Sequence, residues 1–474
     1  MVRLNKEGEY SALGQGSGCQ QEGEEITAVV CLPLFVPSTR LTQHYILCGY
    51  NTGWIRVFSE SGVLLTAQQL ETTSVLSIKV RAPPPVFKIA KLRQFANENE
   101  DVTILFRGNK IVTIDGQSLW MVLRVCDGQR ESGIDASHMH TAFTYKKWDL
   151  QHQDEVNDIL SLGPSPTYSQ IPYNDPSTAI STTNAFPPKN ATSQFIAVGS
   201  HPMLTYYATS ESSKPLMSAA SMASYVVSRV ASPVFSFAKS WWGSSSSSSG
   251  SNTTTTISRH STLHNNKTDN PTPYVPDLRR PPPTHIEPAT PLPAVLSVND
   301  AYRKINHIYL SPAPFISAVQ RNTLAATTDA LGRVVLWDIH EGQMLRIWKG
   351  VRDAVCGWVE VFEHELYQQP KNQTSFKKIL LFLVMYSSKS GFLKIFQMRH
   401  GKQVGAYHVG PGWQLVSCGG EPLGSSMVSP ERRVKASNKN HIGAEYNGLA
   451  NCLLVGSDGE VRKIKIILKE ALLQ

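Results

Sequence analysis

Residue types that usually carry catalysis or hold metals occur in this chain, but their spacing matches no known reactive motif. The sequence of 474 residues contains no GxxxxGK[ST] phosphate loop, no HExxH zinc motif and no GxSxG nucleophile turn. His138 and His140 could supply two metal ligands, yet no third ligand stands near them, and we interpret them as part of a polar loop. An active site needs several groups in one recognisable constellation. The sequence therefore predicts a protein without catalytic residues, cofactor or metal of its own.

A segment of unusual polarity, residues 216–242, has a composition suited to membrane or partner contact. It reads LMSAASMASYVVSRVASPVFSFAKSWW, and its serines recur every three or four residues from Ser218 to Ser240. On a helix they would occupy one face over an arc of about 160°. The opposite face would carry bulky apolar side chains. The candidate contact residues are Leu216, Val226, Val230, Val234, Phe237, Trp241 and Trp242.

Two interpretations of this serine-faced helix stay open. A large apolar face with few charges and no acidic residue would insert at lipid packing defects, where Trp241 and Trp242 suit the interface. Against this, Pro233 removes a backbone hydrogen bond within the segment, and serine is a mediocre helix former. The alternative is that the apolar face packs on the rest of the protein or on a partner subunit, as most amphipathic helices do.

The elements that would carry this helix follow a repeated pattern. Stretches that start at Tyr45, Leu324 and Leu381 each contain an apolar strand, a glycine turn, a second strand, another glycine turn and a third strand. The first glycine would relieve a tight hairpin, and an aromatic residue five positions later would fill the gap between stacked sheets. The signature pairs are Gly53 and Phe58, Gly332 and Trp337, and Gly391 and Phe396.

This period predicts a mostly β fold, a WD-repeat-like β-propeller of about six blade-like units, with seven as the alternative count and some units incomplete. Trp337 is followed by Asp338, the dipeptide typical of such repeats. Weaker units start at Val102 and Gln194, and a degenerate copy lies near the C-terminus. A β-sandwich is the alternative fold, but repetition on both sides of a long insert favours the propeller.

Composition predicts five parts along the chain. Residues 1–23 are expected to be a disordered tail, and residues 24–210 the first part of the propeller. The amphipathic helix occupies 211–242, and a Ser/Thr/Pro-rich loop, expected to be disordered, occupies 243–294. Residues 295–474 complete the propeller.

Charge and cysteine usage indicate the environment. The net charge is +8, but the basic residues are scattered, which argues against nucleic acid as a partner. Seven cysteines without CxxC spacing are typical of reduced thiols in a cytosolic protein. The N-terminus has no apolar signal core, and the apolar run 379–386 is far shorter than the ~20 residues of a membrane-spanning helix. We expect a cytoplasmic protein in which that run is a buried strand.

Several stretches, in order from about Glu24 to Ile466, resemble the N-terminal domain of one protein family. They are GVLLTAQQLETTSVLSIKVR, IVTIDGQSLWMVLRVC, YKKWDL, FIAVGSHP, DALGRVVLWDIHEGQMLRIWKGVRDAVCGWVE and GKQVGAYHVGPG. The family is the non-catalytic (regulatory) subunit of the Rab-three GTPase-activating protein complex. Its members continue into a long helical region beyond the point that matches Gln474.

The resemblance implies a scaffold in Rab regulation and vesicle trafficking. In this family the regulatory subunit binds a separate catalytic subunit, which supplies the arginine for GTP hydrolysis on Rab-three. The pair also acts as a guanine-nucleotide exchange factor for Rab-eighteen at the endoplasmic reticulum. No catalytic residue carries over to this chain, and a peripheral location on endoplasmic reticulum or early secretory membranes is expected. The alternative function is a stand-alone propeller adaptor that binds membranes through its amphipathic helix.

Overall fold

The structure is a computed structural model. Contacts divide the chain into one unit of Met1–Lys214 with Ile286–Gln474 and a second unit of Pro215–His285. All described residues belong to the first unit, so the serine-faced helix predicted at 216–242 lies outside them. The structure describes residues 23–36, 41–82, 100–131, 142–165, 192–210, 286–312, 324–339, 342–366, 379–398, 401–420, 422–424 and 449–466.

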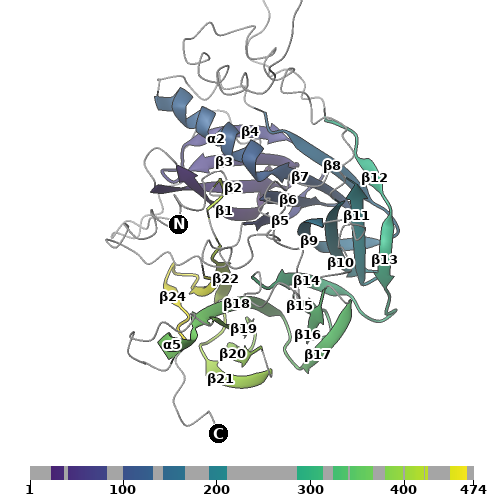
Figure 1. Cartoon of the computed structure of the whole chain (residues 1–474), viewed down its shortest axis with the longest axis vertical. Helices are drawn as coiled ribbons and strands as arrows, with labels where there is room; N and C mark the ends of the chain where they lie inside the picture. The colour runs from purple at the N-terminus through teal and green to yellow at the C-terminus, as the bar shows by residue number, and fades with distance from the viewer. Residues whose placement is uncertain are drawn as a thin grey trace, which may run out of the picture. The chain divides into compact units, whose positions relative to one another are not determined.

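The described residues form six β-sheets, the blades of a β-propeller, so the predicted fold class and the count of six are confirmed (Figure 1). Blade 1 consists of β1 (Ile26–Val36), β2 (Leu41–Tyr50), β3 (Trp54–Ser59) and β4 (Leu64–Gln69). Blade 2 consists of β5 (Val75–Arg81), β6 (Asp101–Phe106), β7 (Lys110–Asp115), β8 (Tyr145–Leu150) and β12 (Thr290–Leu292). Blade 3 consists of β9 (Glu155–Ser165), β10 (Thr192–Ser200), β11 (Leu204–Ser210) and β13 (Ala294–Val298).

The remaining blades follow in chain order. Blade 4 consists of β14 (Ile305–Leu310), β15 (Leu324–Asp329), β16 (Arg333–Asp338) and β17 (Gln343–Lys349). Blade 5 consists of β18 (Ala354–Phe362), β19 (Ile379–Ser387), β20 (Phe392–Gln397) and β21 (Lys402–His408). In blade 6 the described strands are β22 (Gln414–Cys418), β23 (Asn451–Val455) and β24 (Val461–Lys463). The helices within the described residues are α2 (Gly116–Glu131) and α5 (Glu363–Leu366).

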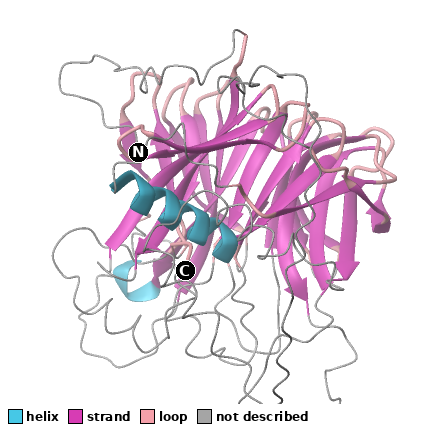
Figure 2. Ribbon diagram, turned by 90° about the horizontal axis from the view of Figure 1, so that it is seen from above, coloured by secondary structure: helices cyan, strands magenta, loops and turns pink. Residues whose placement is uncertain are grey.

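Successive antiparallel strands within a blade turn alternately at the blade's two ends, which gives the propeller two unlike faces. Figure 2 shows the short turns gathered along one side of the strands. We call this side the short-turn face, and the other side the long-connection face, because the strand ends that bound residues 83–99 and 166–191 lie there. The short-turn face comprises residues 51–53, 70–74, 107–109, 151–154, 201–203, 299–304, 330–332, 350–353, 388–391, 409–413 and 456–460.

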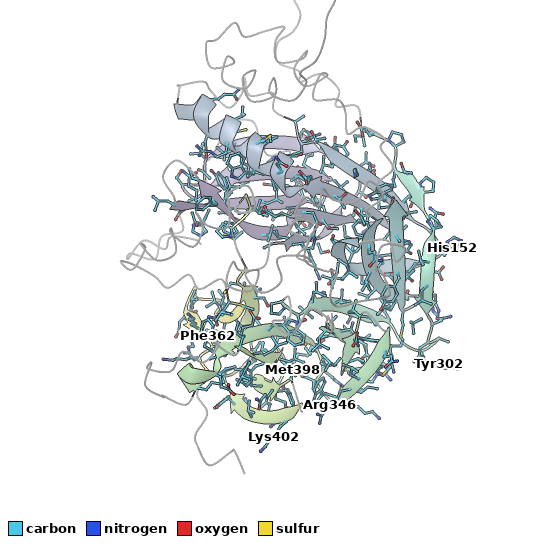
Figure 3. All side chains as sticks on the ribbon, in the orientation of Figure 1. His152, Tyr302, Arg346, Phe362, Met398 and Lys402 are labelled. Carbon is cyan, nitrogen blue, oxygen red and sulfur yellow. The ribbon has the colours of Figure 1, made fainter. Side chains whose placement is uncertain are left out.

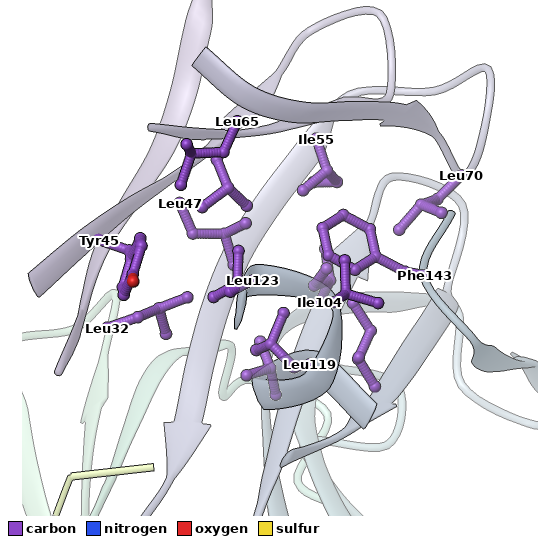
Figure 4. Close-up of a cluster of buried hydrophobic side chains, with 14 of the residues drawn as sticks. Leu32, Tyr45, Leu47, Ile55, Leu65, Leu70, Ile104, Leu119, Leu123 and Phe143 are labelled. Carbon is purple, nitrogen blue, oxygen red and sulfur yellow. The ribbon is translucent and has the colours of Figure 1, made fainter. Parts of the chain in front are cut away.

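Apolar cores lie between neighbouring blades. The largest cluster joins blades 1 and 2, with Leu47 and Ile55 from blade 1 and Ile104 from blade 2, and α2 adds Leu119 and Leu123 (Figure 4). Similar clusters join blades 3 and 4, blades 4 and 5, and blades 5 and 6. Because a central strand has a neighbouring blade on each side, both of its faces are buried, and it reads as a continuous apolar run.

The signature residues occupy matching places in three blades. Gly53, Gly332 and Gly391 have φ angles of 77°, 75° and 68°, a left-handed region that favours glycine, and their turns lie on the short-turn face. The aromatic partners are less uniform. Trp337 is 2% exposed in the core of blades 3 and 4, and its Nε1 donates to Thr327 Oγ1 at 2.8 Å. The remaining members are Phe396, buried between blades 4 and 5, Asp338, buried at the end of β16, and Phe58, which is only half-buried.

The weaker unit that starts at Val102 was expected to continue as a strand, but residues 116–131 form helix α2. Asp115 caps this helix, because its carboxylate accepts the Ser118 amide at 2.9 Å. Leu119 and Leu123 recur at the spacing of one helical face and are fully buried. The helix therefore covers one edge of the core of blades 1 and 2.

A strap of residues 286–298 closes blades 2 and 3 after the second unit (Figure 1). Its first part, β12, pairs in parallel with β8, and its second part, β13, pairs antiparallel with β11. Residues 286–294 were predicted to belong to a disordered loop, and that boundary is wrong. The pairing partners of the strap lie far away in sequence, so the local Pro-rich composition did not reveal them.

A buried ion pair anchors the start of the strap. Lys147 Nζ lies 2.6 Å from Glu71 Oε2 and donates to the carbonyls of Leu70 at 2.9 Å and Glu287 at 3.1 Å. Lys110 Nζ lies 3.2 Å from the same carboxylate. Burial would raise the pKa of Glu71, but the Lys147 ammonium, the Thr72 amide and Lys110 together lower it to about 2. Three segments distant in sequence thus meet at one carboxylate.

Glu71→Gln is expected to lower the free energy of unfolding of the full chain by about 3 kcal/mol at neutral pH, because Lys147 stays buried without its counter-ion. The folded-state pKa of Glu71 is lowered from 4.5 to about 2, so its stabilisation is present above pH 4.5 and is lost as the pH falls towards 2. Urea unfolding across this range checks both points. Glu60→Gln, on a side chain 61% exposed, is the control, and equal stability of the two variants would contradict the prediction.

Trp337→Ala is expected to cost about 4 kcal/mol of stability, because it empties a fully enclosed site between two blades. Phe58→Ala removes the equivalent signature residue of blade 1, but from a half-buried position, and should cost about half as much. Thermal and urea unfolding of the two variants measure the difference. A Phe58 variant as unstable as the Trp337 variant would show that burial does not set the cost.

Candidate functional site

The turns of the short-turn face are held in fixed positions by close backbone approach. A Cβ atom on Gly53 would stand 2.0 Å from the Glu71 carbonyl oxygen, and one on Gly391 would stand 2.5 Å from the Gly410 carbonyl carbon. Each of these turns therefore packs directly on the connection that leads to the next blade. At these two turns the backbone contacts permit no residue larger than glycine.

Strained residues gather on the same face. Among the described residues, four that are not glycine have positive φ, and all four lie in these turns. Such conformations persist only where the surrounding structure imposes them, and they cluster at functional sites. The four are Asn109 at 61°, His152 at 68°, His201 at 44° and Asp353 at 49°.

Hydrogen bonds join the strained turns of blades 2 and 3. Asn109 Nδ2 donates to the Gln153 carbonyl at 2.6 Å, and Gln153 Nε2 donates to the Pro202 carbonyl at 2.8 Å. The Asp154 amide donates to the His201 carbonyl at 3.1 Å. The turns of these two blades consequently form one rigid surface.

Ion pairs extend this surface to blade 4. Lys304 Nζ lies 2.7 Å from Glu155 Oε2, and the Ala330 amide donates to the Lys304 carbonyl at 3.1 Å. Arg303 Nε lies 3.8 Å from Asp329 Oδ2, which joins the connection 299–304 to the turn 330–332.

Two large apolar side chains stand out from this fixed frame. Tyr302 is 89% exposed, although its amide donates to Asp300 Oδ1 at 3.1 Å (Figure 3). Leu331 is 58% exposed, and its amide donates to Asp329 Oδ1 at 3.0 Å. Tyrosine on a preorganised backbone is typical of the residues that dominate protein interfaces. We take Tyr302 and Leu331 as the candidate functional site, a surface suited to binding a protein.

A second polar cluster joins three inner strands and is structural. Asp158 accepts from Lys79 Nζ at 2.5 Å, from Ser77 Oγ at 3.2 Å and from the Ile308 amide at 3.0 Å. His307 Nδ1 lies 3.9 Å from the same carboxylate, and burial lowers its pKa. The donors already satisfy Asp158, so this cluster ties blades 2, 3 and 4 together. In the ranges that the structure describes, no group of three or more His, Cys, Asp or Glu is placed to hold a metal ion.

The contact site that we predicted from the sequence cannot be compared with the structure. The predicted contact residues of segment 216–242 lie outside the described residues. Within the part of the chain that is described, no helix is long and apolar enough to cross a membrane. Sequence reasoning missed Tyr302 and Leu331, although Asp300 is a residue typical of turns and indicated a turn beside Tyr302. Nothing in the local sequence shows that both side chains reach solvent on one face.

Comparison with solved structures gives weak likenesses. Raptor from Chaetomium thermophilum is 11% identical with a TM-score of 0.32, and the match covers 82% of this chain and 21% of Raptor. BBS1N in complex with ARL6DN is 7% identical with a TM-score of 0.40, covering 94% and 80%. Saccharomyces cerevisiae Sqt1 is 10% identical with a TM-score of 0.35, covering 94% and 76%. Values this low say nothing about function.

Comparison with protein families gives a definite result. Residues 2–416 match the family described as "Rab3 GTPase-activating protein regulatory subunit N-terminus". The matched region begins before β1 and ends within β22, so it contains all strands of blades 1 to 5. The chain therefore belongs to the family of Rab3 GTPase-activating protein regulatory subunits, in the N-terminal region of that subunit.

Proposed function

We propose that this chain is a non-catalytic scaffold that binds the catalytic subunit of a heterodimeric Rab regulator. The observation that carries the proposal is the extent of the family match, because residues 2–416 contain five complete blades. What the chain shares with the regulatory subunits is thus the propeller. In this proposal, activation of GTP hydrolysis on Rab3 is the work of the catalytic subunit.

The short-turn face is the surface we assign to the catalytic subunit. Tyr302 and Leu331 are exposed on two turns that a hydrogen bond and an ion pair join to each other. A preorganised surface loses little conformational entropy on binding, so its apolar contacts contribute more fully to affinity.

The proposed complex also promotes nucleotide exchange on Rab-eighteen and resides on endoplasmic reticulum or early secretory membranes. This part of the proposal rests on the resemblance of the sequence stretches to the family. In this proposal the propeller positions the catalytic subunit at the membrane. That role requires binding surfaces and no reactive groups on this chain.

Membrane contact through residues 216–242 is the second function that we propose. Strand β11 ends at Ser210 on the long-connection face, whereas β12 begins at Thr290, which pairs with Trp148 at the outer edge of blade 2. The chain therefore leaves the propeller on the face opposite Tyr302 and rejoins it at the outer edge of blade 2.

The double variant Tyr302→Asp with Leu331→Asp is expected to lower recovery of the catalytic subunit by about tenfold in affinity purification of the tagged full chain, because charge replaces the exposed apolar contacts. Quantitative mass spectrometry of the eluate measures the recovery. Val63→Asp with Val461→Asp, two exposed valines outside this face, is the matched control. Loss of the catalytic subunit with both pairs would indicate unfolding, and its absence from the wild-type eluate would disprove the scaffold function.

Val230→Asp with Trp241→Asp is expected to abolish flotation of the chain with phosphatidylcholine vesicles, because both changes place charge on the apolar face of the predicted helix. Ser221→Asp with Ser236→Asp puts the same charge on the serine face and should preserve flotation. Deletion of residues 216–242 should leave recovery of the catalytic subunit unchanged. If this deletion alone removed the catalytic subunit, the segment would be a docking element and not a membrane contact.

A further inference from the structure

The outer edge of blade 4 is an apolar strand without a neighbour among the described residues. Strand β17 is the last in the order β14-β15-β16-β17. Its side chains Met344, Leu345 and Ile347 are 41%, 52% and 37% exposed. An edge strand offers a row of backbone amides and carbonyls that can pair with another chain.

The neighbouring outer strands extend this apolar rim. On blade 3, Val295 and Leu296 of β13 are 67% and 53% exposed, and on blade 5, Tyr407 of β21 is 56% exposed. A Cβ atom on Gly401 would stand 2.0 Å from Arg346 Nη1, so the guanidinium of β17 lies against the turn that begins blade 5's outer strand. The exposed edges of blades 4 and 5 therefore meet at Arg346.

The rim carries charge of one sign. Strands β13, β17 and β21 read AVLSV, QMLRIWK and KQVGAYH, which include Arg346, Lys349 and Lys402 and no acidic residue. Figure 3 shows Arg346 and Lys402 on the outer strands of their blades. Complementary charge steers association and fixes the register of binding, so the partner that fits this rim is acidic.

The propeller already shows how a blade accepts an additional strand. In blade 2, β12 pairs in parallel with the outer strand β8 as a fifth strand, although about 140 residues separate the two. The register runs from Thr290 opposite Trp148 to Leu292 opposite Leu150. Strand β17 is longer than β12 and offers the same kind of edge.

We propose that β17 binds an extended acidic segment of a partner protein, which pairs with blade 4 as a fifth strand. The apolar side chains of that segment contact Leu345 and Ile347, and its carboxylates pair with Arg346, Lys349 and Lys402. The surface is separate from Tyr302, so binding at β17 does not require binding of the catalytic subunit. The inference rests on the proposed scaffold function only in what the bound partner is for, which is to join the same complex. The scaffold thus recruits a second protein by strand addition.

Two other occupants fit the charge less well. A second copy of the chain paired through β17 would bring Arg346 and Lys349 of both copies together, and like charges on paired strands are destabilising. The chain's own segment 216–242 contains no acidic residue, so its charge does not complement that of the rim.

Binding of a fluorescein-labelled peptide of alternating valine and glutamate to the full chain tests the proposal. We expect saturable binding that weakens with salt, and hydrogen exchange of residues 343–349 slowed by about tenfold at saturation, because their outward amides become paired. A peptide of alternating valine and lysine should not bind. Binding without slower exchange in β17, or equal binding of the lysine peptide, would overturn the proposal.

Charge-reversal variants identify the binding edge. Arg346→Glu with Lys349→Glu and Lys402→Glu should weaken peptide binding by about tenfold, since each lost exposed pair contributes a fraction of a kcal/mol and reversal adds repulsion. The matched control reverses three exposed charges elsewhere, Arg107, Lys389 and Lys465, and should change binding less than about twofold. Unchanged binding in the first variant would contradict the assignment.

The same variants separate this inference from the scaffold function. The β17 variant should still recover the catalytic subunit, and the Tyr302 and Leu331 variant should still bind the acidic peptide. Loss of peptide binding in wild type with the catalytic subunit retained would defeat only the strand-addition proposal. Slower exchange of β17 with phosphatidylserine vesicles but not with peptide would assign the rim to membranes, and a dimer abolished by the charge reversal would assign it to a second copy. Either result overturns the proposal.

Discussion

The antiparallel order of strands within each blade is the constraint on which the arrangement of surfaces depends. Because the strands that follow one another along the chain within a blade reverse direction, connections between the first and second strands leave from one face, and those between the second and third from the other; the added strand β12, parallel to β8, is the exception. The long connections within a blade, such as residues 83–99 and 166–191, begin and end on one face, so the opposite face can consist of tight turns. The division between a face for insertions and a face for rigid contacts thus follows from connectivity before any side chain is considered.

Insertion of Pro215–His285 into blade 3 is accommodated by the strap. The chain rejoins the propeller at the edge of blade 2 and only then completes blade 3, so β12 and β13 bridge two blades. The buried pair of Glu71 and Lys147 fixes the beginning of this bridge through the Glu287 carbonyl. Such a bridge stabilises the junction of blades 2 and 3 at the place where the insertion would otherwise leave blade 3 without its fourth strand.

Blades with a complete glycine and aromatic signature were predictable, because their turns need left-handed glycine and their cores need a large ring. Gly332 and Trp337 satisfy both needs, whereas Phe58 keeps the spacing while lying half-buried. Helix α2 was missed because its apolar residues directly follow a strand of the same composition. Strand β12 was missed because its partner β8 is remote in sequence. The local sequence pattern predicts turns and buried strand faces. It does not predict which strands pair when their residues are far apart in the sequence.

The candidate binding surfaces were unpredictable for a related reason. In β17 the residues Met344, Leu345 and Ile347 have the composition of a buried strand, and they are exposed because, among the described strands, none follows β17 in blade 4. Blade 2 shows the alternative outcome, in which β12 covers the edge. Whether an apolar strand becomes core or interface is therefore decided by its place in the order of strands. In this propeller a fifth strand supplied by the chain completes one blade, and by the same geometry a fifth strand supplied by a partner can complete another.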